Sequence, residues 1–309
     1  LIVFRADGNV TPFPWERKMR ALLYCFFVAV GLIGAGTSQA GDWLPSGNAK
    51  RLGFDQDRLD RIAPVMQAHV DNGRISGAVM VIARDGKIVY RDSVGYADIE
   101  NKVPMKEDAV FRIFSMTKAI TTTAAMILVE EGKLRLTDPV SKFIPAFTNM
   151  KVYVSGDGEE MELEEQKNPV TVHHLLTHTS GIPYGGREPA TSAYNDVNSS
   201  GAKTLAELTN IIASKPLVFQ PGDRWMYGLS TDVMGRVIEV ASGQAFEEFL
   251  AERITGPLGM TETSFFITSD LSNRLAAAYD DTDDGLRVAA GLGQRSYELG
   301  NALPSGGAG

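Results

Sequence analysis

The chain has 309 residues, of which 44% are hydrophobic and 8% aromatic, so it can bury the core of one large domain or of one domain with two lobes. Its formal net charge is -8 at pH 7, and no part of the sequence is a block of Lys and Arg. Clustered basic charge is the signature of nucleic-acid binding, so this composition excludes nucleic acid as a partner. Cys25 is the only cysteine, which excludes disulfides and a thiol nucleophile from the rest of the chain.

Residues 19–40 have the pattern of a secretory signal peptide. The basic stretch "RKMR" precedes the apolar run "ALLYCFFVAVGLIGAG", and Ser38 and Ala40 have the spacing of a signal-peptidase site. The apolar run is shorter than the ~20 residues of a membrane-spanning helix, although an uncleaved anchor helix is the alternative interpretation. Because the chain starts at Leu1 without methionine, we expect residues 1–18 to be upstream sequence carried into the reading frame. The predicted mature domain, residues 41–309, would be periplasmic or extracellular, without stable membrane insertion after cleavage.

The mature domain is predicted to open with a helix and an antiparallel pair of strands. Apolar residues recur at helical spacing in "DQDRLDRIAPVMQAHVDNG" until Gly73 ends the pattern. The next stretch, "GAVMVIARDGKIVYRDSVGYAD", holds two β-rich runs joined at Asp85-Gly86, which is a strong hairpin signal.

A long apolar helix is predicted within residues 111–132, "FRIFSMTKAITTTAAMILVEEG". It begins near Ser115 and ends at Gly132. Residues 119–129 hold only three threonines among aliphatic side chains and a methionine, so the helix has no broad polar face. We therefore expect it to be buried nearly all round.

The remaining predicted elements are short. "KVYVSGDGEEMELEE" indicates an exposed hairpin, "TVHHLLTHTSGIP" a short helix, and residues 187–200 a polar, mobile surface loop. "TLAELTNIIAS" and "STDVMGRVIEVASGQAFEEFLAERI" predict helices, the second broken at Gly243. No later segment supplies convincing partner strands for the sheet begun by residues 77–97, and the chain stops at "LPSGGAG". We expect a truncated reading frame.

Ser115 and Lys118 form an S-x-x-K pair at the start of the apolar helix. Residues i and i+3 share a helix face, so the lysine amine can reach the serine hydroxyl. Serine is a weak nucleophile without a nearby base, and burial favours the neutral amine that can accept its proton. The helix N-terminus adds backbone N–H groups that favour negative charge. The alternative is a helix N-cap followed by a lysine that reaches water, and a second S-x-x-K at Ser200 to Lys203 lies in a polar loop and is interpreted as chance.

Four segments, in this order, resemble the serine hydrolases of the β-lactamase and penicillin-binding superfamily: "VFRIFSMTKAIT", "LLTHTSGIP", "FQPGDRWMYGLSTDVMGRVIE" and "GPLGMTETSF". The resemblance runs from about Leu52 to the last residue and is closest to class C β-lactamase-like enzymes and family VIII carboxylesterases. It implies an α+β fold of the β-lactamase/transpeptidase type, with an antiparallel sheet flanked by helices and an all-helical lobe. The C-terminal strands of that fold would be missing from this chain.

The resemblance implies a role for three residues. Ser115 matches the acylated nucleophile of the family, Lys118 its helix-borne lysine, and Tyr227 the second-motif tyrosine that shares proton traffic with the lysine. Without the resemblance, Tyr227 reads as a buried core tyrosine with a satisfied hydroxyl. The Ser115 N–H would be one oxyanion donor, and the family takes the other from a later strand with a Lys-Thr-Gly, His-x-Gly or Trp-x-Gly motif. No such motif is visible, so we expect little turnover, since one lost donor costs about 100- to 1,000-fold.

Leu229 favours an ester substrate. Family members that act on β-lactams or peptides usually have Asn at this place, two residues after the tyrosine, where it bonds a substrate amide. Leucine offers no such group, so a carboxylesterase is the favoured activity. The alternatives are a β-lactamase, a D-Ala-D-Ala carboxypeptidase or D-aminopeptidase-like hydrolase, and a non-catalytic protein that binds cell-wall fragments. The expected partner is a small-molecule ester or amide, and the oligomeric state is left open.

The sequence favours neither a metal nor a cofactor. His173, His174 and His178 lack the glutamate of an HExxH motif, and their predicted helix has a packing role in the family. The acidic stretch "DDTDDG", residues 280–285, departs from a calcium loop at Thr282 and is interpreted as a solvated turn. No G-x-S-x-G elbow of an α/β-hydrolase is present.

Overall fold

The computed structural model describes residues 44–197, 200–289 and 303–308, and its chain divides into two compact units, Leu1–Gly95 and Tyr96–Gly309. The predicted leader and signal peptide, residues 1–40, lie outside the described residues. Among the helices that are described, none has the length and apolar character to cross a membrane.

The first unit is built on the predicted hairpin. Strands β1 (Gly77–Arg84) and β2 (Lys87–Asp98) pair antiparallel around Asp85 and Gly86, which both have positive φ, as the turn requires. The predicted helix is divided in two, α1 (Gln56–Leu59) and α2 (Ile62–Asp71), and α2 contacts β1. Strand β2 continues into the second unit, where it pairs with the short strand β3 (Val103–Pro104).

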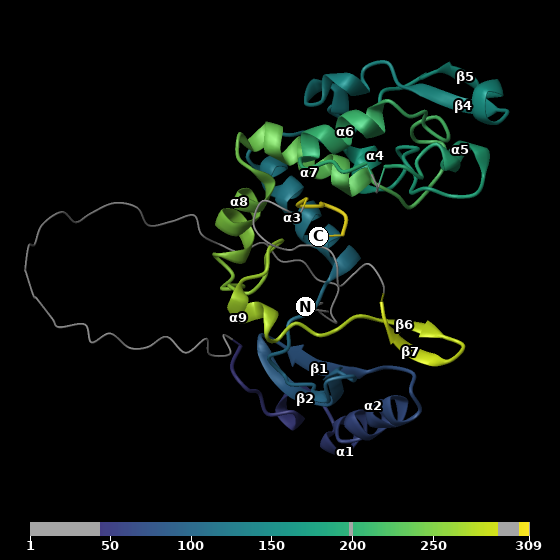
Figure 1. The fold of residues 1–309 in the computed structure, drawn as a ribbon. Coiled ribbons are helices and arrows are strands. Elements are labelled where there is room, and N and C mark those ends of the chain that lie inside the picture. The colour runs from purple at the N-terminus through teal and green to yellow at the C-terminus, as the bar shows by residue number, and fades with distance from the viewer. Residues whose placement is uncertain (1–43, 198–199, 290–302, 309) are drawn as a thin grey trace, which may run out of the picture. The chain divides into compact units, whose positions relative to one another are not determined.

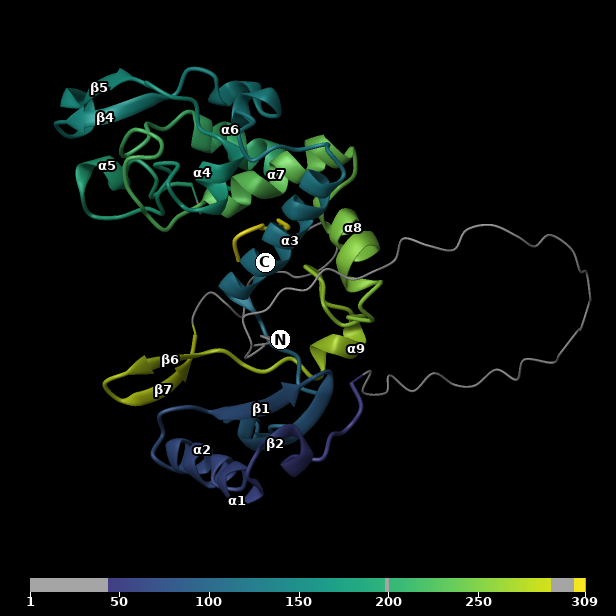
Figure 2. The same ribbon diagram turned by 180° about the vertical axis from the view of Figure 1, so that it is seen from behind.

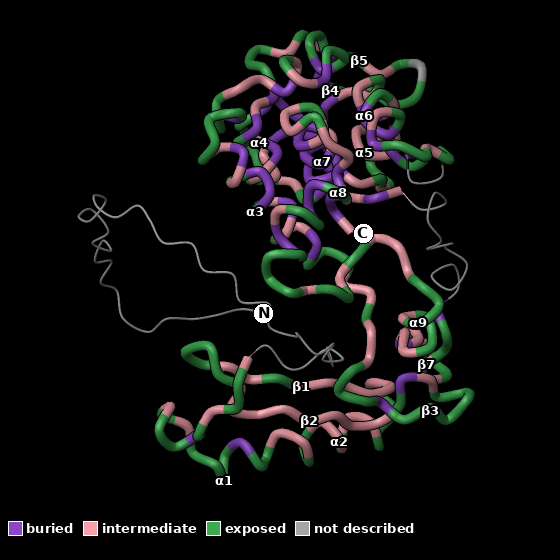
Figure 3. The backbone as a smooth tube through the Cα atoms, turned by 90° about the vertical axis from the view of Figure 1, so that its left-hand side faces the viewer, coloured by how far each residue is buried: buried purple, intermediate pink, exposed green. Residues whose placement is uncertain are grey.

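The second unit holds the helices that build the main core. Helix α7 (Ser230–Ser242) contacts α3 (Thr117–Glu130), α4 (Val172–Leu176), α6 (Leu205–Ala213) and α8 (Phe246–Leu250), as Figures 1 and 2 show from opposite sides. The buried residues of the second unit are concentrated on these helices (Figure 3). The other elements of the unit are β4 (Lys151–Ser155), β5 (Glu162–Glu165), α5 (Pro189–Ser192), α9 (Ser269–Ser272), β6 (Tyr279–Thr282) and β7 (Gly285–Val288).

Helices α7 and α8 confirm the predicted break at Gly243. This glycine caps α7 with a φ of 76°, a conformation that side chains disfavour. The chain then re-enters a helix at α8, followed by one π-helical turn, Ala251–Thr255. The β4–β5 hairpin likewise confirms the exposed hairpin predicted around Gly156.

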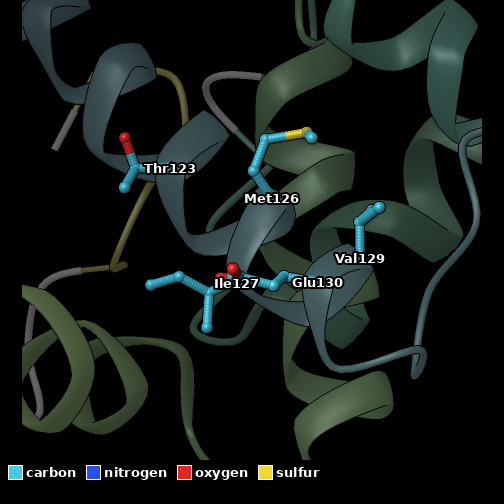
Figure 4. Close-up of a pocket in the computed structure, with 5 residues that line it drawn as sticks. All are labelled: Thr123, Met126, Ile127, Val129 and Glu130. Carbon is cyan, nitrogen blue, oxygen red and sulfur yellow. The ribbon is translucent and has the colours of Figure 1, made fainter. Parts of the chain in front are cut away.

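The prediction that α3 is buried nearly all round is wrong. Thr121, Ala124 and Leu128 face the core, but Thr123 and Met126 lie on an exposed side of the helix. Figure 4 shows this side, a shallow hollow of about 440 Å³ lined by Thr123, Met126, Ile127, Val129 and Glu130. Composition misled here because apolar side chains also cover much of a folded protein's surface.

Two segments interpreted as irregular are more ordered than expected. The polar stretch at 187–200 contains α5, and both Tyr194 and Val197 in it are buried in the main core. The stretch interpreted as a solvated turn at 280–285 does turn at Asp283 and Asp284, which are exposed, and the strands on either side, β6 and β7, pair antiparallel. In the described residues this hairpin forms a two-stranded sheet of its own and does not extend the sheet of β1, β2 and β3.

Candidate active site

Ser115 lies in a single 3₁₀ turn, Phe114–Met116, that leads directly into α3. Phe114, the residue before it, has a φ of 43°, in the left-handed region that non-glycine residues rarely adopt. Such backbone strain persists only where the surrounding structure enforces it, and it concentrates at functional sites. The sharp bend presents Ser115 at the N-terminal end of α3, where backbone N–H groups have no partner within the helix.

Lys118 lies one turn further along, and its amine is held beside the serine. Its Nζ is 3.2 Å from Oγ of Ser115, as expected for side chains three residues apart in a helix. The amine donates to the carbonyl oxygen of Gly307 at 2.7 Å and lies 3.5 Å from the hydroxyl of Tyr184. The alternative of a lysine that simply reaches water does not fit these contacts.

Tyr227 completes the cluster from the segment before α7. Its hydroxyl oxygen lies 2.7 Å from Oγ of Ser115, and its ring lies 4.6 Å from the Lys118 amine. The next residue, Gly228, has no room for a side chain because the backbone of Ile182 and Pro183 presses against it. This close approach explains why a glycine follows the tyrosine. It also fixes the backbone next to Tyr227, and with it the direction of the Tyr227 side chain.

The surroundings of Tyr227 favour loss of its proton. Burial raises the pKa of Tyr227, but hydrogen bonds with Lys118 and Ser115 and the positive charge of Lys118 outweigh it, so that the pKa is lowered. For Tyr184, burial is the largest effect and raises the pKa to about 12, with smaller contributions from Asp232 and Tyr227. Of the two phenols near Lys118, Tyr227 is therefore the one suited to carry a proton between groups.

His178 contributes a neutral aromatic wall to the site. Its ring centre lies 4.8 Å from that of Tyr227, and its backbone has a φ of 56°. Burial, and then the charge of Lys118, lower the pKa of His178, so the imidazole is uncharged at pH 7. Its buried Nδ1 has no hydrogen-bond partner in the described part of the chain.

His174 has a structural role at the start of α4. The Thr171 N–H donates to Nδ1 of His174, and the His174 N–H donates to the Thr171 hydroxyl, which together form a capping box. Across residues 44–197, 200–289 and 303–308, no three His, Cys, Asp or Glu side chains are grouped as metal ligands would be. Ser200 and Lys203 of the second S-x-x-K are exposed in a loop before α6, and Ser200 lines a cavity of about 1050 Å³ together with Phe114 and Tyr184.

Sequence reasoning missed three contributors to the site: Tyr184, Asp232 and the segment Leu303–Ala308. Tyr184 follows "HTSGIP" at a place where the pattern showed only the end of a helix. Asp232 lies among apolar residues of α7, and an isolated acidic residue there has no distinctive spacing. The C-terminal segment lies beside α3 in both Figures 1 and 2, a contact between residues more than 180 apart that no local pattern could indicate.

Removal of the Tyr227 hydroxyl is expected to slow acylation of Ser115 by about 100-fold or more, because a positioned proton carrier contributes this much. In the wild-type protein the acylation rate should rise with pH and level off below pH ~10, the ordinary pKa of tyrosine, since the pKa of Tyr227 is lowered. The measurement is the pH dependence of labelling by a fluorophosphonate for wild type, Tyr227→Phe and the control Tyr153→Phe. Equal pH profiles for all three proteins would contradict the assignment.

A fold of two units, with a serine, a lysine and a tyrosine gathered at the start of a core helix, places the protein in the class with the β-lactamase/transpeptidase-like fold. The chain belongs to the beta-lactamase family, whose model matches residues 62–309. It is 37% identical over 270 residues to "Esterase EstB" of Burkholderia gladioli, which covers 81% of this chain and 65% of the relative. It is 36% identical over 220 residues to "Protein Rv1367c" of Mycobacterium tuberculosis, which covers 70% of this chain and 54% of the relative.

Solved structures confirm the fold. The structure of "EstCE1, a hydrolase with promiscuous acyltransferase activity" matches with a TM-score of 0.69 and 32% identity, over 82% of this chain and 68% of that one. The predicted superfamily and its α+β fold are thus confirmed. The chain spans about half to two thirds of the length of the curated relatives it matches. The catalytic roles of Ser115, Lys118 and Tyr227 stay predictions.

Proposed function

We propose that the protein is a serine hydrolase that works through an acyl-enzyme on Ser115, and that its main activity is that of a carboxylesterase. One observation carries the proposal: Oγ of Ser115 lies within hydrogen-bond reach of both the Lys118 amine and the Tyr227 hydroxyl. A serine activated by a neighbouring base is the arrangement that nucleophilic catalysis requires.

The geometry supports a two-step reaction. Oγ of Ser115 attacks the ester carbonyl while its proton passes to the Lys118–Tyr227 pair, and the pair then protonates the leaving alkoxide as the alcohol departs. Water attacks the resulting acyl-serine and gives up a proton to the same pair, which returns a proton to Oγ of Ser115 as the bond to the acyl group breaks and the acid is released. Lys118 and Tyr227 are in contact, and the hydrogen bond and charge of Lys118 lower the pKa of Tyr227. The Ser115 N–H supports the developing oxyanion as one of its donors.

The walls beside the site support an ester with an apolar acyl group. A cavity of about 1050 Å³ is lined by Phe114, Tyr184 and Leu229 together with many other apolar side chains. Leu229 is only 4% exposed and belongs to the main core, so it presents hydrocarbon where an amide substrate would need a polar partner. The similarity to an esterase from Burkholderia gladioli agrees with this choice.

A substrate panel tests the proposal. We expect the protein to release p-nitrophenol slowly from medium-chain p-nitrophenyl esters. We also expect a mass increase of one acyl group, or one phosphonyl group with a fluorophosphonate, on the peptide that contains Ser115. Faster acylation by a penicillin than by any ester would favour the β-lactamase alternative. Failure of every probe to modify Ser115, combined with binding of muropeptides, would favour a non-catalytic cell-wall binder and refute the enzyme.

Export of the protein is part of the proposal and rests on residues 19–40. A cleaved signal would place the hydrolase in the periplasm or the medium, where small esters reach it directly. Retention of the full-length chain in the cytoplasmic fraction of an expressing cell would refute this part.

A further inference from the structure

Asp232 is a buried carboxyl group that the proposed reaction does not use. It lies in the first turn of α7, five residues after Tyr227, and is only 4% exposed. A carboxyl group removed from water is costly unless hydrogen bonds replace its hydration. Its retention inside the protein, next to a cluster of reactive side chains, therefore calls for a physical reason.

The partners of Asp232 come from the C-terminal segment. The Ser305 hydroxyl donates to Oδ1 of Asp232 at 2.5 Å, and the Gly307 N–H donates to the same oxygen at 3.4 Å. Side chains at Gly306 and Gly307 would collide with the Thr231 carbonyl and with the Asp232 carboxyl group. Two glycines thus let the backbone of this turn approach Asp232 closely enough to bond it.

The same turn holds the catalytic lysine. The Gly307 carbonyl accepts a hydrogen bond of 2.7 Å from Nζ of Lys118, and the Gly306 carbonyl accepts one of 2.7 Å from the Thr121 hydroxyl, one turn further along α3. Asp232 binds the turn from one side, and α3 binds it from the other. The position of the Lys118 amine is therefore linked to Asp232 through the backbone of residues 305–307.

We propose that Asp232 is a positioning residue for acyl transfer: through the Ser305–Gly307 turn it holds the Lys118 amine beside Ser115, and its charge acts on the neighbouring Tyr227. This inference rests on the proposed function. Asp232 lines the cavity of about 1050 Å³ beside the site, but its hydrogen bonds go to the turn rather than to Ser115, so it acts on the reaction through the turn and through its charge.

The effect of the Asp232 charge depends on the other groups that face the Lys118 amine. They are the hydroxyls of Ser115, Tyr184 and Tyr227, the ring of His178, the carbonyl of Gly307 and the carboxyl group of Asp232. His178 is neutral at pH 7, and the raised pKa of Tyr184 keeps it protonated. Burial raises the pKa of Asp232, and hydrogen bonds from Ser305 and Gly307 and the charge of Lys118 oppose that shift without cancelling it. Asp232 is the acidic group in this set.

Charge and position can be separated with two variants. Asp232→Asn keeps an oxygen for the turn but removes the charge, whereas Ser305→Ala keeps the charge and removes the shortest bond to the turn. The control is Asp138→Asn, because the Asp138 carboxylate is bonded instead to Lys142 and to the Arg135 N–H. The probe is a fluorophosphonate: Oγ of Ser115 bonds to phosphorus, fluoride leaves, and the serine proton passes to the Lys118–Tyr227 pair.

The readout is the second-order labelling rate of Ser115 as a function of pH, with the unfolding temperature recorded in parallel. For Asp232→Asn we expect the plateau rate to fall by about 10- to 100-fold, since small misplacements of a catalytic group have effects of this size. We also expect the acid limb of the pH profile to move to lower pH, because the charge of Asp232 raises the pKa of Tyr227 and its removal lowers that pKa. Ser305→Ala should lower the plateau by about tenfold with the acid limb unmoved, and Asp138→Asn should leave both unchanged.

The outcomes separate this inference from the function on which it rests. If Asp232→Asn folds and keeps the plateau rate and the acid limb of the wild type, Asp232 has no positioning role. The role is also overturned if Asp138→Asn, at the same loss of unfolding temperature, loses as much rate. If Asp232→Asn does not fold, a wild-type plateau in Ser305→Ala overturns the positioning role. Absence of Ser115 labelling in the wild type would instead refute the proposed function itself.

Discussion

Ser115→Ala is expected to abolish acylation, with a fall in labelling rate of about 10⁴-fold or more, because removal of a catalytic serine eliminates the atom that forms the covalent bond. Ser115 is exposed in its turn, so the substitution creates no cavity and the unfolding temperature should stay close to that of the wild type. The measurement is intact-protein mass after incubation with a fluorophosphonate, supported by hydrolysis rates for p-nitrophenyl esters.

The matched control for this experiment is Ser200→Ala. Ser200 is the serine of the second S-x-x-K, and it lies exposed in a loop that lines the cavity beside the site, so its loss removes no reactive group and should leave Ser115 open to the label. The comparison tests whether position in the fold, rather than the four-residue pattern, confers reactivity. A label that persists on Ser115→Ala, or disappears from Ser200→Ala, would show that the nucleophile has been assigned to the wrong residue.

Lys118→Met is expected to lower the acylation rate by about 100- to 10,000-fold, since it removes the proton acceptor that touches Ser115 but keeps a flexible apolar stem. The same substitution also tests whether the Lys118 amine is charged in the wild-type protein. Burial is the main cause of the lowered pKa of His178, and the charge of Lys118 adds to it. Loss of that charge should raise the pKa of His178 toward its ordinary value, while burial keeps it below.

Nuclear magnetic resonance titration of His178 in wild type and Lys118→Met measures this second effect, with Lys203→Met as the control for loss of a surface lysine. An unchanged pKa of His178 would indicate that the amine is already neutral in the resting protein. An unchanged acylation rate would show that Lys118 is not the base and that Tyr227 acts without it.

Local patterns succeeded wherever a few neighbouring residues decide the structure. Asp85 and Gly86 form the turn between β1 and β2 because their backbone conformations suit it, and Gly243 ends α7 for the same reason. Ser115 and Lys118 meet because three residues of helix bring them together. The resemblance to a known family identified Tyr227, which spacing by itself would have left in the core.

Patterns failed where the environment of a residue depends on distant parts of the chain. The exposed side of α3 has the same aliphatic character as its buried side, so only packing distinguishes Met126 from Leu128. The strands β6 and β7 were missed because the stretch between Asp280 and Gly285 is a run of consecutive polar residues, which resembles a solvated loop.

What the sequence determined by itself is the proximity of Ser115 and Lys118 and the family, since both depend on the identity and spacing of nearby residues. What only the tertiary structure decided is how that pair is held. The bonds from Asp232 to Ser305, and from Lys118 to Gly307, join residues separated by 73 and 189 positions. Contacts over such distances exist only after the chain has folded, because packing rather than local conformational preference brings their partners together.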